Sequence, residues 1–156
     1  MDKKTLIQYV EELASKTDIK DCISDNDGKD SLGKSQFRSI AELCAKADFY
    51  EEIKLLIEYK ESKGNGWDKN IAKPGMALSL DPEGYYFWDK NIAKSGFITC
   101  GEVIVRYMEN IKKQSSEVDV LKNLELFFGY MHWKANVLCK ENKKGNEKSK
   151  GKGEYR

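Results

Sequence analysis

The chain offers few side chains that could carry out catalysis. Its only histidine, His132, stands in the aromatic stretch FFGYMHWKANVL. A histidine there is more often packed than catalytic, although it could pair with a cysteine in space. Adjacent carboxylates such as Glu51 and Glu52 are typical of a solvated helix face. Because no phosphate-binding glycine-rich motif, nucleophile elbow or HExxH motif occurs, the sequence predicts a protein that is not an enzyme.

Metal and disulfide chemistry also finds little support. The chain has four cysteines, which are Cys22, Cys44, Cys100 and Cys139. They lie far apart with no CxxC pair, so we expect reduced, mostly buried thiols. The stretch DNDG suggests a calcium loop, but with Gly28 at the sixth position the first and twelfth are Ile23 and Lys34, where calcium needs carboxylates. We therefore predict no metal site and no cofactor, and interpret residues 18–34 as a loop.

A nine-residue segment occurs twice, and both copies could contribute lysines to a binding surface. The first copy, WDKNIAKPG, covers residues 67–75, and the second, WDKNIAKSG, covers residues 88–96. Two copies are too few for a solenoid, so we interpret them as a 21-residue tandem duplication tolerated in a surface connection. Trp67 and Trp88 are then apolar anchors.

An alternative gives the repeat a role in binding. Each copy carries two lysines at i and i+4, which would share one helical face beside a tryptophan and could contact phosphates near a stacking surface. These lysines are Lys69 with Lys73 and Lys90 with Lys94.

Helical periodicity dominates the elements that must position these residues. Apolar side chains recur at helical spacing in residues 5–16, 35–47, 48–64 and 99–113, and in a last stretch that begins at Ser116. The expected N-terminal caps are Ser35, Asp48 with Glu51, and Thr99 with Glu102. Asp81 and Pro82 predict a further helix start, with the second copy at its end. The sequence thus predicts an all-α fold, a compact bundle of about five main helices with an extended middle connection and no sheet.

The last helix has the most regular pattern in the chain. Its apolar residues recur in alternating steps of three and four, and they are Leu121, Leu124, Phe128, Met131, Ala135 and Leu138. Phe127, Tyr130 and Trp133 widen this stripe. A wide stripe favours packing inside a bundle or against another subunit.

Length and charge suggest one domain with a separate tail. The 156 residues suit a single core, and no stretch is apolar enough to cross a bilayer or serve as a signal peptide, so we expect a cytoplasmic protein. Residues 140–156 hold seven basic and three acidic residues, a net charge of +4. Since the whole chain has a net charge of +1, residues 1–139 carry −3. We predict a single helical domain over 1–139 and a disordered Lys/Gly-rich tail over 140–156, with weak phosphate attraction possible.

Two segments carry a resemblance to a known family. GKSQFRSIAELC (33–44) and LELFFGYMHWKANVL (124–138) resemble the helix start and the final aromatic helix of the small subunit of type III CRISPR effector complexes. The segments between them match the family's intervening helices in pattern, so the resemblance spans roughly residues 30–140. It implies a non-catalytic helical subunit, present in several copies beside other effector subunits, that binds the backbones of guide RNA and target RNA.

Such a subunit needs cations directed at phosphates, because base pairing carries the sequence information. The candidate RNA-contacting residues are Lys34, Gln36, Arg38, Lys69, Lys73, Lys90, Lys94, Arg106 and Lys134. Arg38 faces away from the apolar side of its helix and either reaches phosphate or pairs with Glu42 at i+4. The near-zero net charge and the aromatic stripe favour the alternative of a protein–protein adaptor with no nucleic-acid role.

Overall fold

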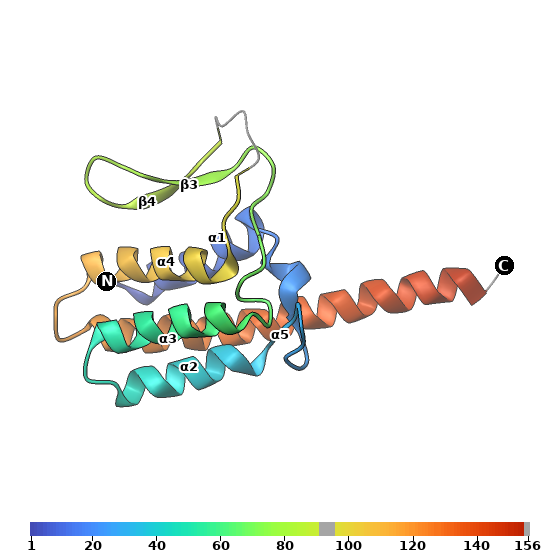
Figure 1. The fold of residues 1–156 in the computed structure, drawn as a ribbon, viewed down its shortest axis with the longest axis horizontal. Helices are drawn as coiled ribbons and strands as arrows, with labels where there is room; N and C mark the ends of the chain where they lie inside the picture. The colour runs from blue at the N-terminus through green and yellow to red at the C-terminus, as the bar shows by residue number, and fades with distance from the viewer. Residues whose placement is uncertain (91–95, 155–156) are drawn as a thin grey trace.

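A helical bundle accounts for most of the molecule. The computed structural model describes the backbone of residues 1–90 and 96–154 and the side chains of residues 1–90 and 96–145. Within these ranges there are five α-helices, which are α1 (Lys3–Lys16), α2 (Ser35–Lys46), α3 (Tyr50–Lys63), α4 (Cys100–Gln114) and α5 (Val120–Glu154). The five predicted main helices are confirmed. The body packs around the first half of α5, while its second half projects away (Figure 1).

The prediction of a fold without a sheet is wrong. Two short strands, β1 (Ile23–Ser24) and β2 (Leu32–Gly33), pair in parallel, and β3 (Ala77–Leu80) pairs antiparallel with β4 (Tyr86–Asp89). This second pair forms a hairpin above α4 (Figure 1).

Asp81 closes the hairpin turn instead of capping a helix. Its carboxylate accepts hydrogen bonds at 2.9 Å from the backbone N–H groups of both Glu83 and Tyr85. Gly84, at φ +89°, completes the turn. Asp, Pro and Gly serve both helix starts and turns, and the aromatic residues that follow favour a strand.

Two of the predicted caps also change. Lys34, not Ser35, is the N-cap residue of α2, and it makes no side-chain cap bond. At α3 the capping carboxylate is that of Glu52, which accepts from the N–H groups of Asp48 and Phe49 at 3.0 and 3.1 Å. The cap at Thr99 is confirmed, because its hydroxyl accepts from the Glu102 N–H at 3.2 Å.

The core follows the predicted apolar stripes closely. All the predicted stripe residues of α5 are buried except Leu121, which is half-buried, and Phe127 is buried beside them. Ile7, one of the apolar residues at helical spacing in residues 5–16, is exposed. The four cysteines are buried and free, as expected. No helix in the described part of the chain is long and apolar enough to cross a membrane.

The first copy of the repeat belongs to the core, which corrects its interpretation as part of a surface connection. Trp67 is 2% exposed and meets the Phe37 ring edge-on, with ring centroids 5.9 Å apart. The backbone runs antiparallel to residues 98–101. Ile71 N–H donates to the Ile98 carbonyl at 3.0 Å, and Gly101 N–H donates to the Trp67 carbonyl at 2.9 Å. Trp67 is therefore an apolar anchor, as predicted.

The second copy has a different structure although its sequence is nearly identical. Trp88 lies in β4, half-buried, and its indole N–H donates to the Tyr107 hydroxyl at 2.8 Å. It packs against the edge of the core and anchors the hairpin to α4. Residues 91–95 of this copy lie outside the described residues.

The expected boundary at residue 139 falls inside α5. The backbone of α5 is helical through Glu154. Beyond residue 139, the Asn142 amide donates to the Lys20 carbonyl at 2.8 Å, and Glu141 forms an ion pair with Lys20 at 3.5 Å. The first turn of the predicted tail therefore packs against the short 3-10 helix η1 (Ile19–Cys22) that follows α1.

Candidate nucleic-acid interface

The two segments that carry the family resemblance lie against each other. Segment 33–44 forms most of α2, segment 124–138 lies within α5, and the two helices pack side by side. His132 of α5 joins them, because its Nδ1 lies 3.2 Å from the Lys34 carbonyl. The Asn136 amide contacts the other ring nitrogen at 3.5 Å. The ring thus contacts a carbonyl and an amide, not a thiol, and links the two helices.

A groove of about 570 Å³ runs between α2 and α5. We call it the α2–α5 groove, and the residues of its lining that matter here are Arg38, Glu42, Lys46, Glu125 and Trp133. Trp133 is 69% exposed and packs on one side against Tyr130, with ring centroids 5.6 Å apart. An exposed aromatic ring beside cations is the combination that stacks bases and contacts phosphates in single-strand binding proteins.

Arg38 lies in this groove with its charge partly neutralised. Its side chain is 69% exposed, and its Nε lies 3.4 Å from the Glu42 carboxylate, the i+4 partner that the sequence offered as an alternative. An exposed pair of this kind contributes little to stability, because solvent screens it. Arg38 can therefore exchange Glu42 for a phosphate at small cost.

Gln36 is held within the protein. Its amide donates to the Asp27 carboxylate at 2.6 Å, and its oxygen accepts from the Lys60 ammonium at 2.6 Å. Burial lowers the pKa of Lys60. Asp27 also accepts from the Gly33 N–H at 2.9 Å, so this carboxylate of the DNDG stretch orders the loop before α2. Gln36 therefore joins α2, α3 and the loop.

Lys134 lies apart from the α2–α5 groove. It forms an ion pair with Glu11 at 3.0 Å, so its ammonium contacts α1 and not α2. The two lysines of the first copy do not share a helical face, because this copy consists of turns and extended backbone. Lys69 and Lys90 are exposed, whereas Lys73 donates to the Ser15 carbonyl at 3.1 Å. Lys94 lies outside the described residues.

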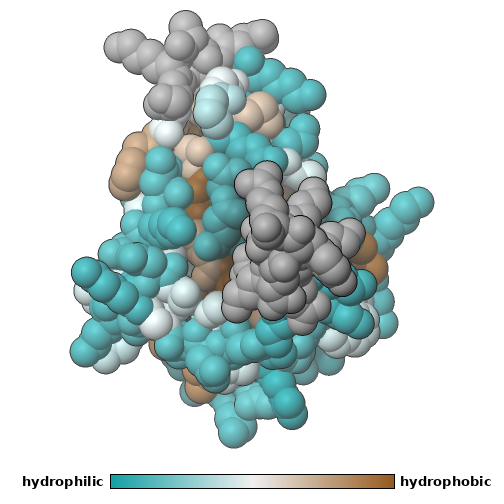
Figure 2. Space-filling view, turned by 90° about the vertical axis from the view of Figure 1, so that its right-hand side faces the viewer, coloured by the Kyte–Doolittle hydropathy of each residue, from teal (hydrophilic) through white to brown (hydrophobic). Residues whose placement is uncertain are grey.

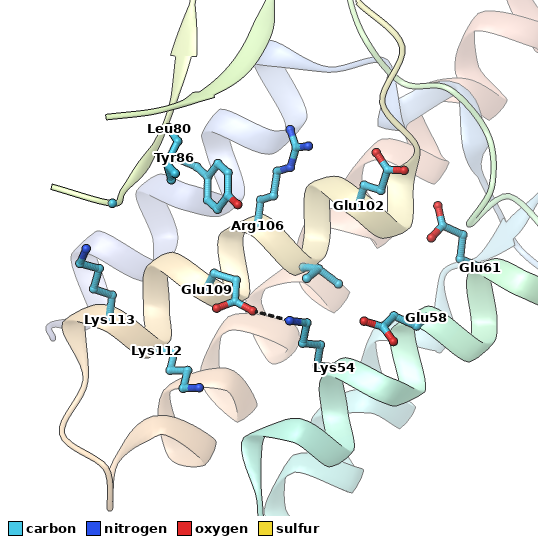
Figure 3. Close-up of a pocket in the computed structure, with 12 residues that line it drawn as sticks. Lys54, Glu58, Glu61, Leu80, Tyr86, Glu102, Arg106, Glu109, Lys112 and Lys113 are labelled. Carbon is cyan, nitrogen blue, oxygen red and sulfur yellow. Dashed lines mark ion pairs between the residues drawn. The ribbon is translucent and has the colours of Figure 1, made fainter. Parts of the chain in front are cut away.

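Arg106 lines a separate pocket of about 830 Å³ between α3, α4 and the β3–β4 hairpin. Its guanidinium donates to the Leu78 carbonyl at 3.1 Å and lies 5.3 Å from the centre of the Tyr86 ring. Figure 3 shows Glu58, Glu61 and Glu102 at one end of this pocket and Lys112 and Lys113 at the other. Between them, Lys54 pairs with Glu109 at 3.0 Å.

The cations of this pocket are engaged by the protein itself. Lys112 lies 4.6 Å from the centre of the Tyr50 ring, and Lys113 donates to the Glu83 carbonyl and lies 4.8 Å from the centre of the Tyr85 ring. The contacts of Lys113 and Arg106 join the hairpin to α4, whereas that of Lys112 joins α4 to α3. The cationic side chains of this pocket thus have partners within the protein.

A second cleft brings Lys34, one of the candidate residues, together with three lysines that were not among them. We call it the lysine cleft. It measures about 510 Å³ and is lined by Lys34, Asn136, Cys139, Lys140, Lys143 and Lys144. It lies where α2 begins, so the positive end of that helix dipole adds to the lysine charges. The surface on the side from which α5 projects is mainly hydrophilic (Figure 2).

The sequence contains a signal that could have found this cleft. No proline follows Leu138, and the first glycine after it is Gly145, so the sequence has no helix stop at residue 139 and allows α5 to continue past it. Extending the helix would have brought Lys140, Lys143 and Lys144 beside the body as a group. Their lysine-rich context is instead typical of a solvated tail.

In the part of the chain with described side chains, no three His, Cys, Asp or Glu residues come together as a metal site. Comparisons of the chain with family models, curated proteins and solved structures found no match.

Proposed function

We propose that the chain is a non-catalytic subunit of a ribonucleoprotein that binds the RNA backbone without sequence specificity. This is the role implied by its resemblance to the small subunit of type III CRISPR effector complexes. Its partners would then be guide RNA, target RNA, other effector subunits and further copies of the chain. The RNA would lie along the face shared by α2 and α5.

The observation that carries the proposal is the exposed ring of Trp133 beside Arg38 in the α2–α5 groove. Because the indole ring is exposed, the folded protein does not gain the free energy that burying this large apolar surface would give. A base stacked on the ring would recover that surface, and the neighbouring guanidinium would reach the adjoining phosphate. Both residues come from the segments that carry the resemblance.

The surrounding carboxylates predict modest affinity. Glu42 and Glu125 line the same groove, so a bound strand must displace the Arg38–Glu42 ion pair. Weak contacts of this kind suit a subunit that binds in several copies along one strand, because linked sites add avidity. They also suit a subunit that leaves sequence recognition to base pairing.

The test is binding of a fluorescein-labelled single-stranded RNA of mixed sequence to the isolated chain, measured by anisotropy over a range of salt concentrations. Trp133→Ala should weaken binding about tenfold, since stacking contributes ~1 to 3 kcal/mol per base. Arg38→Ala should weaken binding of every sequence alike and reduce the salt slope by ~0.7, the value for one phosphate contact on a single strand. Neither variant should change the melting temperature much, because both side chains are exposed.

Leu55→Ala is the matched control for Trp133→Ala. Leu55 is 66% exposed on α3, so this variant removes exposed apolar surface outside the groove and should leave RNA binding unchanged. If Trp133→Ala and Arg38→Ala both bind RNA as the unchanged chain does, the groove is not the interface.

A second candidate function is a protein–protein adaptor. Val137 favours this function. It lies one turn from Trp133 on α5 and is 48% exposed, so it extends the apolar surface beyond the aromatic ring. In that case the chain would show no salt-dependent RNA binding. Trp133→Ala would instead abolish recovery of a specific protein partner, and Arg38→Ala would not.

A further inference from the structure

Two lysines of the lysine cleft contact the carboxylate of Asp25, which lines an adjoining pocket that shares Cys139 and Lys143 with the cleft. One of the Asp25 oxygens lies 3.0 Å from the Lys34 ammonium and the other lies 2.5 Å from the Lys143 ammonium. The thiol of Cys139 also donates to this carboxylate at 3.4 Å. Asp25 thus bridges the start of α2 and the second half of α5. The two lysines hold the pKa of Asp25 well below its usual range, so it is ionised at neutral pH.

The charges around the cleft do not balance. Four lysines and no carboxylate line it, while Asp25 and Asp21 line the adjoining pocket and Asp25 pairs with two of the lysines. Glu141 is the next acidic residue along α5, but it pairs with Lys20 at 3.5 Å. Lys140 and Lys144 are exposed. An excess of cations around one small cleft attracts anions, and the carboxylate of Asp25 shows where such an anion is coordinated.

We propose that the lysine cleft binds a phosphate of a nucleic-acid backbone and that Asp25 competes for the same lysines as a built-in counter-anion. The inference rests on the proposed function and adds a second contact region on the α2–α5 face. A phosphodiester entering the cleft takes Lys34 and Lys143 from Asp25. Because these lysines are already neutralised, they release fewer counterions on binding than free lysines would. Asp25 therefore lowers both the affinity and its salt dependence.

The variant that tests this is Asp25→Asn. An asparagine keeps the size of the side chain but removes the charge that holds the two lysines. Affinity for the labelled single-stranded RNA should rise by about threefold to tenfold at low salt, and the salt slope should steepen by ~0.7 to 1.4, which corresponds to one or two freed lysines. Its melting temperature should stay within a few degrees of the unchanged chain, because the pairs it loses are partly exposed and therefore screened by solvent.

Glu141→Gln is the matched control, since it changes the net charge by the same amount on the same face. It frees only Lys20, outside the cleft, so it should raise the affinity less than Asp25→Asn does. Adding Lys143→Gln to Asp25→Asn should remove most of the gain, whereas adding it to Glu141→Gln should not remove that variant's smaller gain.

The source of the phosphate is distinguished by the choice of ligand. Single-stranded DNA of the same sequence should show the same gain as RNA, because the cleft contacts phosphate and not the 2′-hydroxyl. Inorganic phosphate at millimolar concentration should displace the labelled RNA more strongly from the Asp25→Asn variant than from the Glu141→Gln variant.

The two proposals fail in different ways. A chain that binds no RNA even at low salt would overturn the proposed function. If the chain binds RNA but the Asp25→Asn and Glu141→Gln variants have the same RNA affinity and salt slope, only the role of Asp25 and the lysine cleft is overturned.

Discussion

Gly66 fits against the backbone of Leu32 with no room for a side chain. A Cβ on Gly66 would lie 2.8 Å from the Leu32 nitrogen, and Gly66 adopts φ +90°, a conformation that L residues rarely take. Gly66 directly precedes Trp67, whereas Phe87 stands at the equivalent position before Trp88. This difference explains why the first copy of the repeat occupies the core, since a phenylalanine would collide with β2.

Gly66→Ala should therefore destabilise the protein through two effects, the strain of an alanine at positive φ and the clash of its Cβ with Leu32. Gly75→Ala is the matched control, because Gly75 has φ +75° and an added Cβ would meet nothing within 4 Å. We expect a loss of ~1 kcal/mol for Gly75→Ala and at least ~2 kcal/mol for Gly66→Ala, measured by urea unfolding. Equal losses of unfolding free energy in the two variants would mean that β2 moves aside to accommodate the added methyl group.

Deletion of residues 67–87 should leave a folded protein. The deletion joins Gly66 to Trp88, so the second copy can enter the core and pair with residues 98–101 as the first copy does. Removing residues 66–86 instead deletes the same number of residues but leaves Phe87 before Trp88. We expect cooperative thermal melting for the first deletion and its loss for the second. If both variants melt cooperatively, Gly66 does not decide which copy occupies the core. If neither variant does, the second copy cannot take the place of the first.

Asn110→Ala should release the β3–β4 hairpin from α4. The Asn110 side chain accepts from the Tyr86 N–H at 2.8 Å and donates to the Tyr86 carbonyl at 2.9 Å, and it is buried. An isolated two-stranded hairpin is marginally stable, so these bonds matter. We expect a loss of ~1 to 3 kcal/mol and faster hydrogen exchange of the amides in residues 77–89. Lys113→Ala, which removes an exposed contact to the same hairpin, should change that exchange far less.

Stability should fall at alkaline pH. Burial raises the pKa of the Cys22 thiol to about 11 and that of Cys44 to about 12, from an ordinary value of 9.0. The unfolded chain therefore loses these protons at lower pH than the folded chain does. The contribution is complete below pH 9 and is lost as the pH rises from 9 through 11 to 12, with a limiting slope of ~1.4 kcal/mol per pH unit for each thiol.

Urea midpoints at pH 8, 9.5 and 10.5 measure this loss. Cys44→Ala should lower the midpoint at pH 8 but make the later decline shallower, because one of the titrating groups is gone. Midpoints that stay constant up to pH 10.5 would contradict the prediction.

The sequence predicted the start of α2 as a candidate site but not the partners of its residues. Lys34 and Arg38 were chosen from a motif, and the i+4 pairing of Arg38 with Glu42 could be foreseen from helix geometry. Asp25 and Asp27 reach Lys34 and Gln36 only because β1 and β2 pair and return the loop to the helix. The lysine cleft was missed for a similar reason, since it needs the start of α2 beside the far half of α5.

What the sequence determined by itself is the set of helices. Apolar spacing and capping act over a few residues, so the five main helices and the buried stripe of α5 could be predicted locally. The nearly identical copies of the repeat could not be told apart in this way. Their different structures depend on contacts between remote segments, namely Gly66 with Leu32 for the first copy and Trp88 with Tyr107 for the second. Only the tertiary structure decided which copy enters the core, because a short segment takes the conformation that its distant neighbours can pack against.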